Sequence, residues 1–270
     1  MKKLLMLLGI FLFIYGCEDD QNPASSEEDT GAAAYYPGEA GSQFVFAVDT
    51  FDVATNSYFP YGTRTANIVG GSNVGGTEYY VQRNVLQPAP AGDDPETYFR
   101  RSETGVYFYV DTLGLADAIL EIDDTLATLI DIVADPEINV FSTPLEDGKF
   151  WDGYKLNLDI PSIGFTLSIV DLSASYDGVE SITTPATNGI PTEAVKIKYD
   201  VTLRIPDDPA NLFEPEARTY TGYGWYIQNI GLTMVEGSGL LVNALSGGEF
   251  NLDDTLSVYR ETLTSYDIVK

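Results

Sequence analysis

The chain has 270 residues, 14 Lys and Arg against 41 Asp and Glu, and a formal net charge of -27. It contains no histidine and a single cysteine, which excludes Ser-His-Asp and Cys-His catalysis, histidine-ligated zinc and an internal disulfide. The acidic balance also argues against nucleic acid as a partner, because affinity for a polyanion depends largely on Lys and Arg that neutralise phosphates.

The first 16 residues have the features of a signal peptide. Lys2 and Lys3 precede an apolar run over residues 4–15, which is shorter than the ~20 residues that a membrane-spanning helix needs. The run ends at Gly16-Cys17, which resembles a bacterial lipobox, where the cysteine is acylated and becomes the first residue. We therefore expect lipidation at Cys17 and a membrane anchor there; the alternative is an ordinary secretory signal that contains a cysteine.

Residues 17–34 are predicted to form a disordered tether. The segment contains six acidic residues and no Lys or Arg, so it lacks the apolar area needed to fold. Its acidic start, directly behind Cys17, resembles the export signal of Bacteroidota lipoproteins that reach the outer face of the outer membrane. We expect a lipid-anchored outer-membrane protein that faces the cell exterior, with the periplasmic face as the alternative. Loss of residues 1–16 would remove Lys2 and Lys3 and change the formal charge from -27 to -29.

Residues 35–270 are predicted to form a single β-rich domain. Short segments rich in Val, Ile, Thr, Tyr and Phe alternate with Gly, Asn, Asp and Pro, a pattern typical of antiparallel β proteins. Residues 194–205 are predicted to form a strand with one solvent-exposed face, because apolar and polar side chains alternate strictly from Val195 to Ile205. The expected fold is mainly β: a curved antiparallel sheet, or an open barrel or sandwich.

Residues 113–134 interrupt this pattern. Apolar residues from Leu115 to Val133 recur at intervals of three and four, and Pro136 follows, which predicts an amphipathic helix packed against the sheet. The alternative is that this helix forms a lid over an apolar ligand cavity.

Several short motifs, in order, resemble an uncharacterised family of Bacteroidota-type envelope lipoproteins. The family motifs are Y-P followed by G-x-x-aromatic-x-aromatic, then G-V-Y, P-L-x-x-G-x-x-W, and W-Y followed by G-L. They match Tyr36-Pro37 with Gly41, Phe44 and Phe46, then Gly105-Val106-Tyr107, Pro144-Leu145 with Gly148 and Trp151, and Gly224-Trp225-Tyr226 with Ile230-Gly231-Leu232. Val179 to Ile197 is similar to a further strand-turn-strand segment. The resemblance implies a mostly β envelope domain without known catalytic residues.

Candidate chemistry rests on acidic and aromatic residues. Paired carboxylates occur at Asp93-Asp94, Asp123-Asp124, Asp207-Asp208 and Asp253-Asp254, and a glycosidase needs two carboxyl groups across a sugar bond. Acidic loops also suit Ca2+, and Asp171, Asp177 and Glu180 are the nearest approach to a calcium-binding spacing, although the full pattern is absent. We expect no other cofactor. The aromatic clusters around Tyr79, Tyr107 and Trp225 are expected to be structural, and Arg100 and Arg101 to neutralise neighbouring acids.

Three functions remain open from the sequence. The first is a non-enzymatic lipoprotein that binds an envelope protein or a glycan, or takes part in envelope assembly. The second is a carrier of a lipid or other apolar ligand in a cavity between sheet and helix, and the third is a carboxylate-dependent glycan hydrolase.

Overall fold

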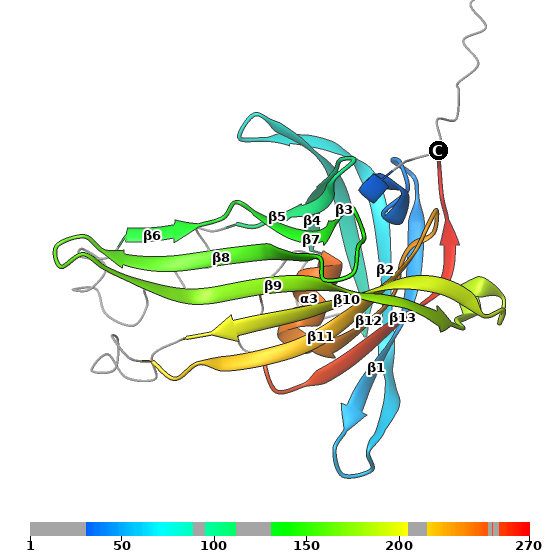
Figure 1. Ribbon diagram of the computed structural model, residues 1–270. Helices are drawn as coiled ribbons and strands as arrows, with labels where there is room; N and C mark the ends of the chain where they lie inside the picture. The colour runs from blue at the N-terminus through cyan, green and yellow to red at the C-terminus, as the bar shows by residue number, and fades with distance from the viewer. Residues whose placement is uncertain (1–30, 89–94, 112–130, 205–214, 248–249, 251–253) are drawn as a thin grey trace, which may run out of the picture.

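The computed structural model describes residues 31–270 except 89–94, 112–130, 205–214, 248–249 and 251–253. Within these residues, 13 strands form one antiparallel sheet (Figure 1). The strands are β1 (Gln43–Asp52), β2 (Ser57–Val74), β3 (Thr77–Gln87), β4 (Glu96–Arg101), β5 (Gly105–Tyr109), β6 (Asp131–Ala134), β7 (Glu137–Ser142), β8 (Phe150–Ile160), β9 (Phe165–Ile182), β10 (Thr192–Leu203), β11 (Arg218–Ile227), β12 (Gly231–Ser238) and β13 (Val258–Asp267). The helices are η1 (Gly31–Tyr35), η2 (Pro185–Thr187) and α3 (Gly239–Gly247).

The sheet order is β6-β8-β9-β10-β11-β12-β13-β1-β2-β3-β4-β5-β7. Most neighbours are consecutive in the chain, and the last strand pairs with the first. The two edge strands, β6 and β7, are consecutive in the chain and are joined by only Asp135 and Pro136. This short connection holds the two edges of the curved sheet close to each other at that point. The sheet is strongly curved but is not closed by a hydrogen-bonded ladder, which confirms the predicted mainly β fold with a curved antiparallel sheet.

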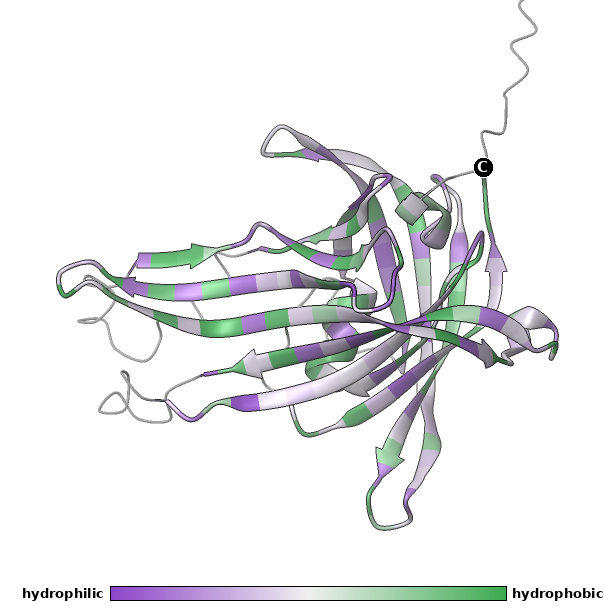
Figure 2. Ribbon diagram, in the orientation of Figure 1, coloured by the Kyte–Doolittle hydropathy of each residue, from purple (hydrophilic) through white to green (hydrophobic). Residues whose placement is uncertain are grey.

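Strand β10 shows how the sequence pattern produces the two faces of the sheet. Val195, Ile197, Tyr199, Val201 and Leu203 are buried, while the polar residues between them lie on the outer face. The same alternation of apolar and polar residues is visible along other strands (Figure 2). The strand predicted over residues 194–205 is therefore present as β10 up to Leu203, while residue 205 lies outside the described residues.

The helix that packs against the sheet is α3, which the sequence analysis did not predict. Figure 1 shows it inside the curve of the sheet, and Leu240, Leu241 and Leu245 are fully buried. Two glycines on neighbouring strands make room for it: a Cβ on Gly222 would lie 3.1 Å from Leu241 Cδ1, and one on Gly237 would lie 3.5 Å from Leu241 Cβ.

The helix predicted over residues 113–134 lies mostly outside the described residues. Its last four residues, Asp131–Ala134, form strand β6 and pair with β8, so the prediction was wrong for this part. In so short a stretch the β-branched pair Ile132-Val133 suits a strand, and alternate residues Asp131 and Val133 are exposed.

The described part of the chain begins at Gly31, and its first element, η1, overlaps the end of the segment 17–34 that was predicted as a tether. Ala32 and Ala34 in η1 are fully buried, and the Ala32 amide donates a hydrogen bond to the Glu103 carbonyl oxygen at 2.9 Å. Gly31 has φ +62°, and a Cβ there would lie 2.2 Å from that same carbonyl oxygen. The small residues Gly31, Ala32 and Ala34 therefore allow residues 31–34 to pack against the sheet.

The Gly- and Asn-containing segments at residues 54–57, 70–76 and 187–189 predict turns, and the structure contains them in part. Asn56 and Asn188 both adopt left-handed backbone conformations, with φ of 51° and 55°, as the turn-forming segments around them predicted. The glycine-rich stretch over residues 70–76 turns only at Gly75-Gly76, because its first residues extend strand β2.

Candidate functional site

Several residues singled out in the sequence lie outside the described part of the chain. These are the signal peptide, Cys17, and the paired carboxylates Asp93-Asp94, Asp123-Asp124 and Asp207-Asp208. Of the fourth pair, Asp253 lies outside the described residues and Asp254 lies within them. Lipidation of Cys17 and carboxylate-based hydrolysis at those pairs remain predictions. The candidate site described below consists of described residues only.

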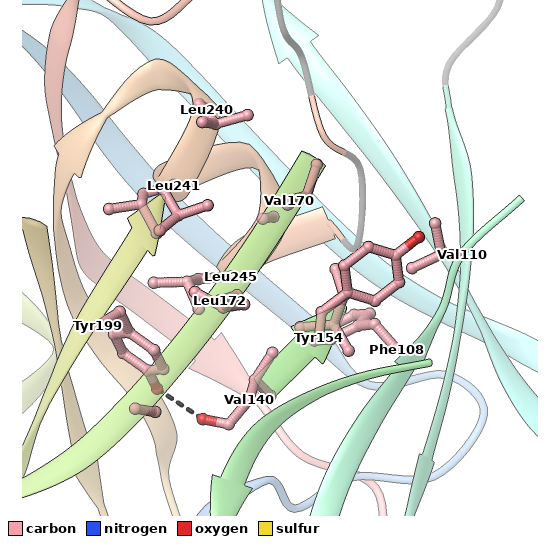
Figure 3. Packing of buried hydrophobic residues seen from close by; sticks show 14 of the residues in the cluster. Phe108, Val110, Val140, Tyr154, Val170, Leu172, Tyr199, Leu240, Leu241 and Leu245 are labelled. Atoms are coloured by element: carbon pink, nitrogen blue, oxygen red, sulfur yellow. Dashed lines mark hydrogen bonds between the residues drawn. The ribbon is translucent and has the colours of Figure 1, made fainter. Parts of the chain in front are cut away.

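The space between α3 and the sheet is filled by side chains (Figure 3). Leu245 packs near Leu172, and both side chains are fully buried, as are Leu240 and Leu241. A pocket lined in part by Tyr36, Arg64 and Leu232 has room for only about 20 Å3, roughly one water molecule. The packing of α3 is that of a core. The cavity of the carrier hypothesis was expected beneath the helix predicted over residues 113–134, most of which lies outside the described residues, so that hypothesis stays a prediction.

Side chains bridge the seam where β7 and β8 meet without a ladder. The Tyr199 hydroxyl donates a hydrogen bond to the Val140 carbonyl oxygen at 2.6 Å, drawn in Figure 3, and lies 2.9 Å from the Tyr226 hydroxyl. The Trp151 indole nitrogen donates to the Asn139 carbonyl oxygen at 3.0 Å. These contacts give two carbonyl groups of the edge strand β7 side-chain donors from β8 and β10, and unprotected sheet edges are a route to aggregation.

A buried ion pair lies on the inner face of the sheet. Arg64 on β2 and Glu261 on β13 have side chains only 6% and 5% exposed, and their closest N–O distance is 2.6 Å. The Arg64 guanidinium also donates to Asn84 Oδ1 at 3.0 Å and lies 4.2 Å from the centre of the Phe46 ring. Every one of these groups is engaged within the fold, so the cluster is structural.

An open groove of about 580 Å3 lies where the segment between η1 and β1 meets β2, β3 and β4. We call it the polar groove. It is lined by Glu39, Ala40, Gly70, Gly71, Ser72, Asn73, Glu78, Tyr79, Tyr80, Arg100 and Arg101. These elements lie at the end of the domain where the described chain begins and where its C-terminus lies (Figure 1).

One side of the polar groove is organised by Arg101. Its guanidinium pairs with the Glu39 carboxylate and lies 4.9 Å from the centre of the Tyr80 ring. The Tyr80 ring stacks on buried Phe99 at 5.2 Å, and its hydroxyl donates to Glu39 Oε1 at 3.1 Å. The three polar side chains therefore have fixed positions.

The other side is organised by Arg100. Two of its nitrogens donate to the two carboxylate oxygens of Glu137, each at 2.6 Å, and its guanidinium lies 4.0 Å from the centre of the Tyr107 ring. The Tyr79 hydroxyl donates to Glu137 Oε1 at 2.7 Å. Burial, together with the Glu137 carboxylate, raises the pKa of Tyr79 to about 12, so it is a neutral donor at physiological pH. The predicted neutralising role of the two arginines is confirmed.

The candidate calcium residues form a different arrangement. Asp171, Asp177 and Glu180 all lie along strand β9, and the Lys196 ammonium lies 3.1 Å from Glu180 and 3.7 Å from Asp177. A hydrogen bond from Trp225, followed by that from Lys196, lowers the pKa of Glu180. Lysine therefore holds the position between the two carboxylates, and no group of metal ligands is found among the described residues.

The motifs behind the family resemblance have structural roles in the fold. Tyr36 packs edge-on against Phe99 and Phe108, and Trp151 bridges the seam. Tyr226 lies on the inner face with its ring 4.9 Å from that of Phe141. The polar groove, by contrast, contains none of the family motif residues. Its signals in the sequence were Arg100 and Arg101, expected to neutralise acids, Tyr79, expected to be structural, and the glycines at 70 and 71, expected to form a turn.

Taken together, the described residues define an open, curved antiparallel sheet around one internal helix, with a polar groove at one end. None of the helices in this part of the chain is long and apolar enough to cross a membrane. No family model matches the sequence, and no curated protein matches it.

Two solved structures are similar. One is a predicted lipoprotein from Parabacteroides distasonis ATCC 8503, with a TM-score of 0.47 and 15% identity, over 88% of this chain and 100% of the other. The other is a predicted exported protein with a YmcC-like fold from Bacteroides fragilis NCTC 9343, with a TM-score of 0.44 and 18% identity, over 87% of this chain and 100% of the other.

Proposed function

We propose that the chain is a lipid-anchored outer-membrane lipoprotein whose β domain faces the cell exterior and works by binding rather than by catalysis. The anchor rests on the sequence: the apolar run ends at the only cysteine, directly after a small residue. Two or three acyl chains on Cys17 would supply the multiple signals that stable membrane attachment needs. The acidic residues that follow Cys17 support the exterior orientation.

The binding role rests on one observation in the polar groove. Glu39 in the groove and the adjacent Glu137 are each held by an arginine, which leaves Glu78 as the one further carboxylate among the lining residues. The hydroxyl groups of the lining belong to tyrosine and serine. A hydrolase would need one carboxyl group that can donate a proton and a second that acts as nucleophile or base. Fixed, charge-balanced polar groups are better suited to recognising a ligand than to transferring protons to it.

Fractionation of cells tests the anchor. Wild-type protein should sediment with the outer membrane, whereas Cys17→Ser should appear in the soluble fraction, and Ser25→Ala in the tether should behave as wild type. Digestion of intact cells with an added protease tests the orientation, because an exterior domain is cleaved and a periplasmic one is protected. Membrane retention of Cys17→Ser would contradict the proposed anchor.

A further inference from the structure

We propose that the polar groove binds a neutral saccharide. The inference rests on the binding role proposed above and names the class of ligand. It is built from the charge balance of the groove, the positions of its hydrogen-bonding groups and the space that its glycines leave open.

Both cations of the groove are already paired: Arg101 with Glu39 and Arg100 with Glu137. Glu78, a further carboxylate of the groove, is exposed to solvent. An anionic ligand would have to compete with Glu39 and Glu137 for the arginines and would also be repelled by Glu78. A cationic ligand would have to compete with the arginines for Glu39 and Glu137, or rely on the exposed Glu78 alone. Either exchange would leave one member of a partly buried pair without its partner, which is costly. A neutral ligand can use both pairs without separating them.

The polar groove contains both hydrogen-bond donors and hydrogen-bond acceptors. The groove presents carboxylates at Glu39 and Glu78, guanidinium groups at Arg100 and Arg101, and the amide of Asn73. Hydroxyl groups both donate and accept, so a ligand with several of them can meet this mixture of donors and acceptors.

The side chains of Tyr80, Arg100 and Arg101 are held in place by contacts within the protein. The Tyr80 ring lies between Phe99 and the Arg101 guanidinium, and Arg100 is held by both oxygens of Glu137. Fixed side chains lose little conformational entropy on binding. Since Phe99 and Arg101 contact the Tyr80 ring, recognition would depend on its hydroxyl edge rather than on stacking of a sugar against its face.

The two glycines of β2 in the polar groove leave space for a ligand. A Cβ on Gly70 would meet no atom within 4 Å, and one on Gly71 would lie 3.5 Å from the Tyr79 carbonyl oxygen. Gly71 pairs with Tyr80 across the β2–β3 ladder, and paired residues point to the same face of a sheet. A larger side chain at Gly71 would therefore stand beside Tyr80, in the groove. The volume of about 580 Å3 lies within the usual range for small-ligand sites.

Titration calorimetry of the detergent-solubilised full chain tests the inference. The probes are neutral trisaccharides of glucose, mannose, galactose and N-acetylglucosamine, compared with an anionic trimer of galacturonic acid and a cationic trimer of glucosamine. At least one neutral trisaccharide should bind, and both charged trimers should bind about tenfold or more weakly than it. Absence of binding by every neutral probe, or preference for a charged one, would overturn the inference.

Two variants place the binding in the groove. Gly71→Leu should weaken binding at least about tenfold, while Ser181→Leu, at an exposed strand position on β9, should bind as wild type. Tyr80→Phe keeps the ring stacked on Phe99 and removes only the hydroxyl, so it should weaken binding even if Gly71→Leu fails to fold. Unchanged affinity in both groove variants would contradict the assignment. Retention of the protein in the outer membrane is measured separately, so the anchor and the ligand can fail independently.

Discussion

At the scale of single residues, the Arg64–Glu261 pair makes the strongest demand on the fold. Removing one partner leaves an uncompensated charge in a buried site, which typically costs about 3–5 kcal/mol. Arg64→Met should therefore lower the free energy of unfolding by that amount, measured by urea denaturation. The exposed pair Arg83–Glu96, with side chains 48% and 38% exposed, provides the control: Arg83→Met should cost less than about 1 kcal/mol. Equal effects of the two substitutions would contradict the role assigned to burial.

Two buried tyrosines should respond in opposite ways to loss of their hydroxyl groups. The Tyr199 hydroxyl bonds the Val140 carbonyl oxygen and Tyr226, so Tyr199→Phe should destabilise the protein by about 1–3 kcal/mol. The Tyr154 hydroxyl is buried and has no hydrogen-bond partner among the described residues, so Tyr154→Phe should be neutral or stabilising. Thermal unfolding of both variants checks the contrast, and a destabilised Tyr154→Phe would indicate a partner outside the described residues.

At the scale of elements, α3 stabilises the inner face of the sheet. Leu245 is fully buried between the helix and the strands, and truncation of a buried leucine to alanine typically costs about 2–5 kcal/mol. Leu245→Ala should fall in that range by chemical denaturation. Leu256→Ala, at a side chain 91% exposed, should change the free energy of unfolding by less than about 0.5 kcal/mol. A small effect of Leu245→Ala would mean that the helix is not part of the core.

The elements also show what the sequence could and could not predict. Strand β10 was predictable because apolar and polar residues alternate without a break from Val195 to Leu203, a pattern that a strand with one solvent-exposed face explains. Helix α3 was missed because its residues, from Gly239 to Gly247, are apolar on nearly every side and so have no amphipathic pattern. The end of the predicted helix failed for a related reason: in four residues, Asp131 to Ala134, helical and strand periodicities cannot be told apart.

At the scale of the whole molecule, tyrosine burial predicts alkaline unfolding. Burial and neighbouring carboxylates raise the pKa of Tyr58 and of Tyr79 to about 12, and burial raises the pKa of Tyr36, Tyr199 and Tyr226. A folded-state pKa above the unfolded value of ~10 gives stability that is complete below pH ~10 and is lost as pH rises through the folded value. Phenolate absorbance should therefore rise together with loss of the circular dichroism of the sheet.

The opposite result is equally clear. If the tyrosines ionise near their usual pKa while the sheet remains intact, the buried rings are accessible to solvent and the packing described here is wrong. Tyr199→Phe serves as the comparison, because it removes one such group and should lessen the loss of stability at alkaline pH.

The candidate site was less predictable than the fold. The sequence correctly predicted acidic partners for Arg100 and Arg101, but it could not identify them. Glu137 lies 37 residues from Arg100, and Glu39 lies 62 residues from Arg101. Such pairs depend on the register of strands that are distant in the chain. Gly71 was visible as a glycine, yet its position across from Tyr80 follows only from the β2–β3 ladder.

The central claim is that the mature protein begins with an acylated Cys17, and mass spectrometry of its N-terminal peptide tests this most directly. The account predicts that the peptide from membrane-extracted protein starts at Cys17, lacks residues 1–16 and carries the added mass of acyl chains. A mature N-terminus at any other residue, or an unmodified Cys17 thiol, would contradict it.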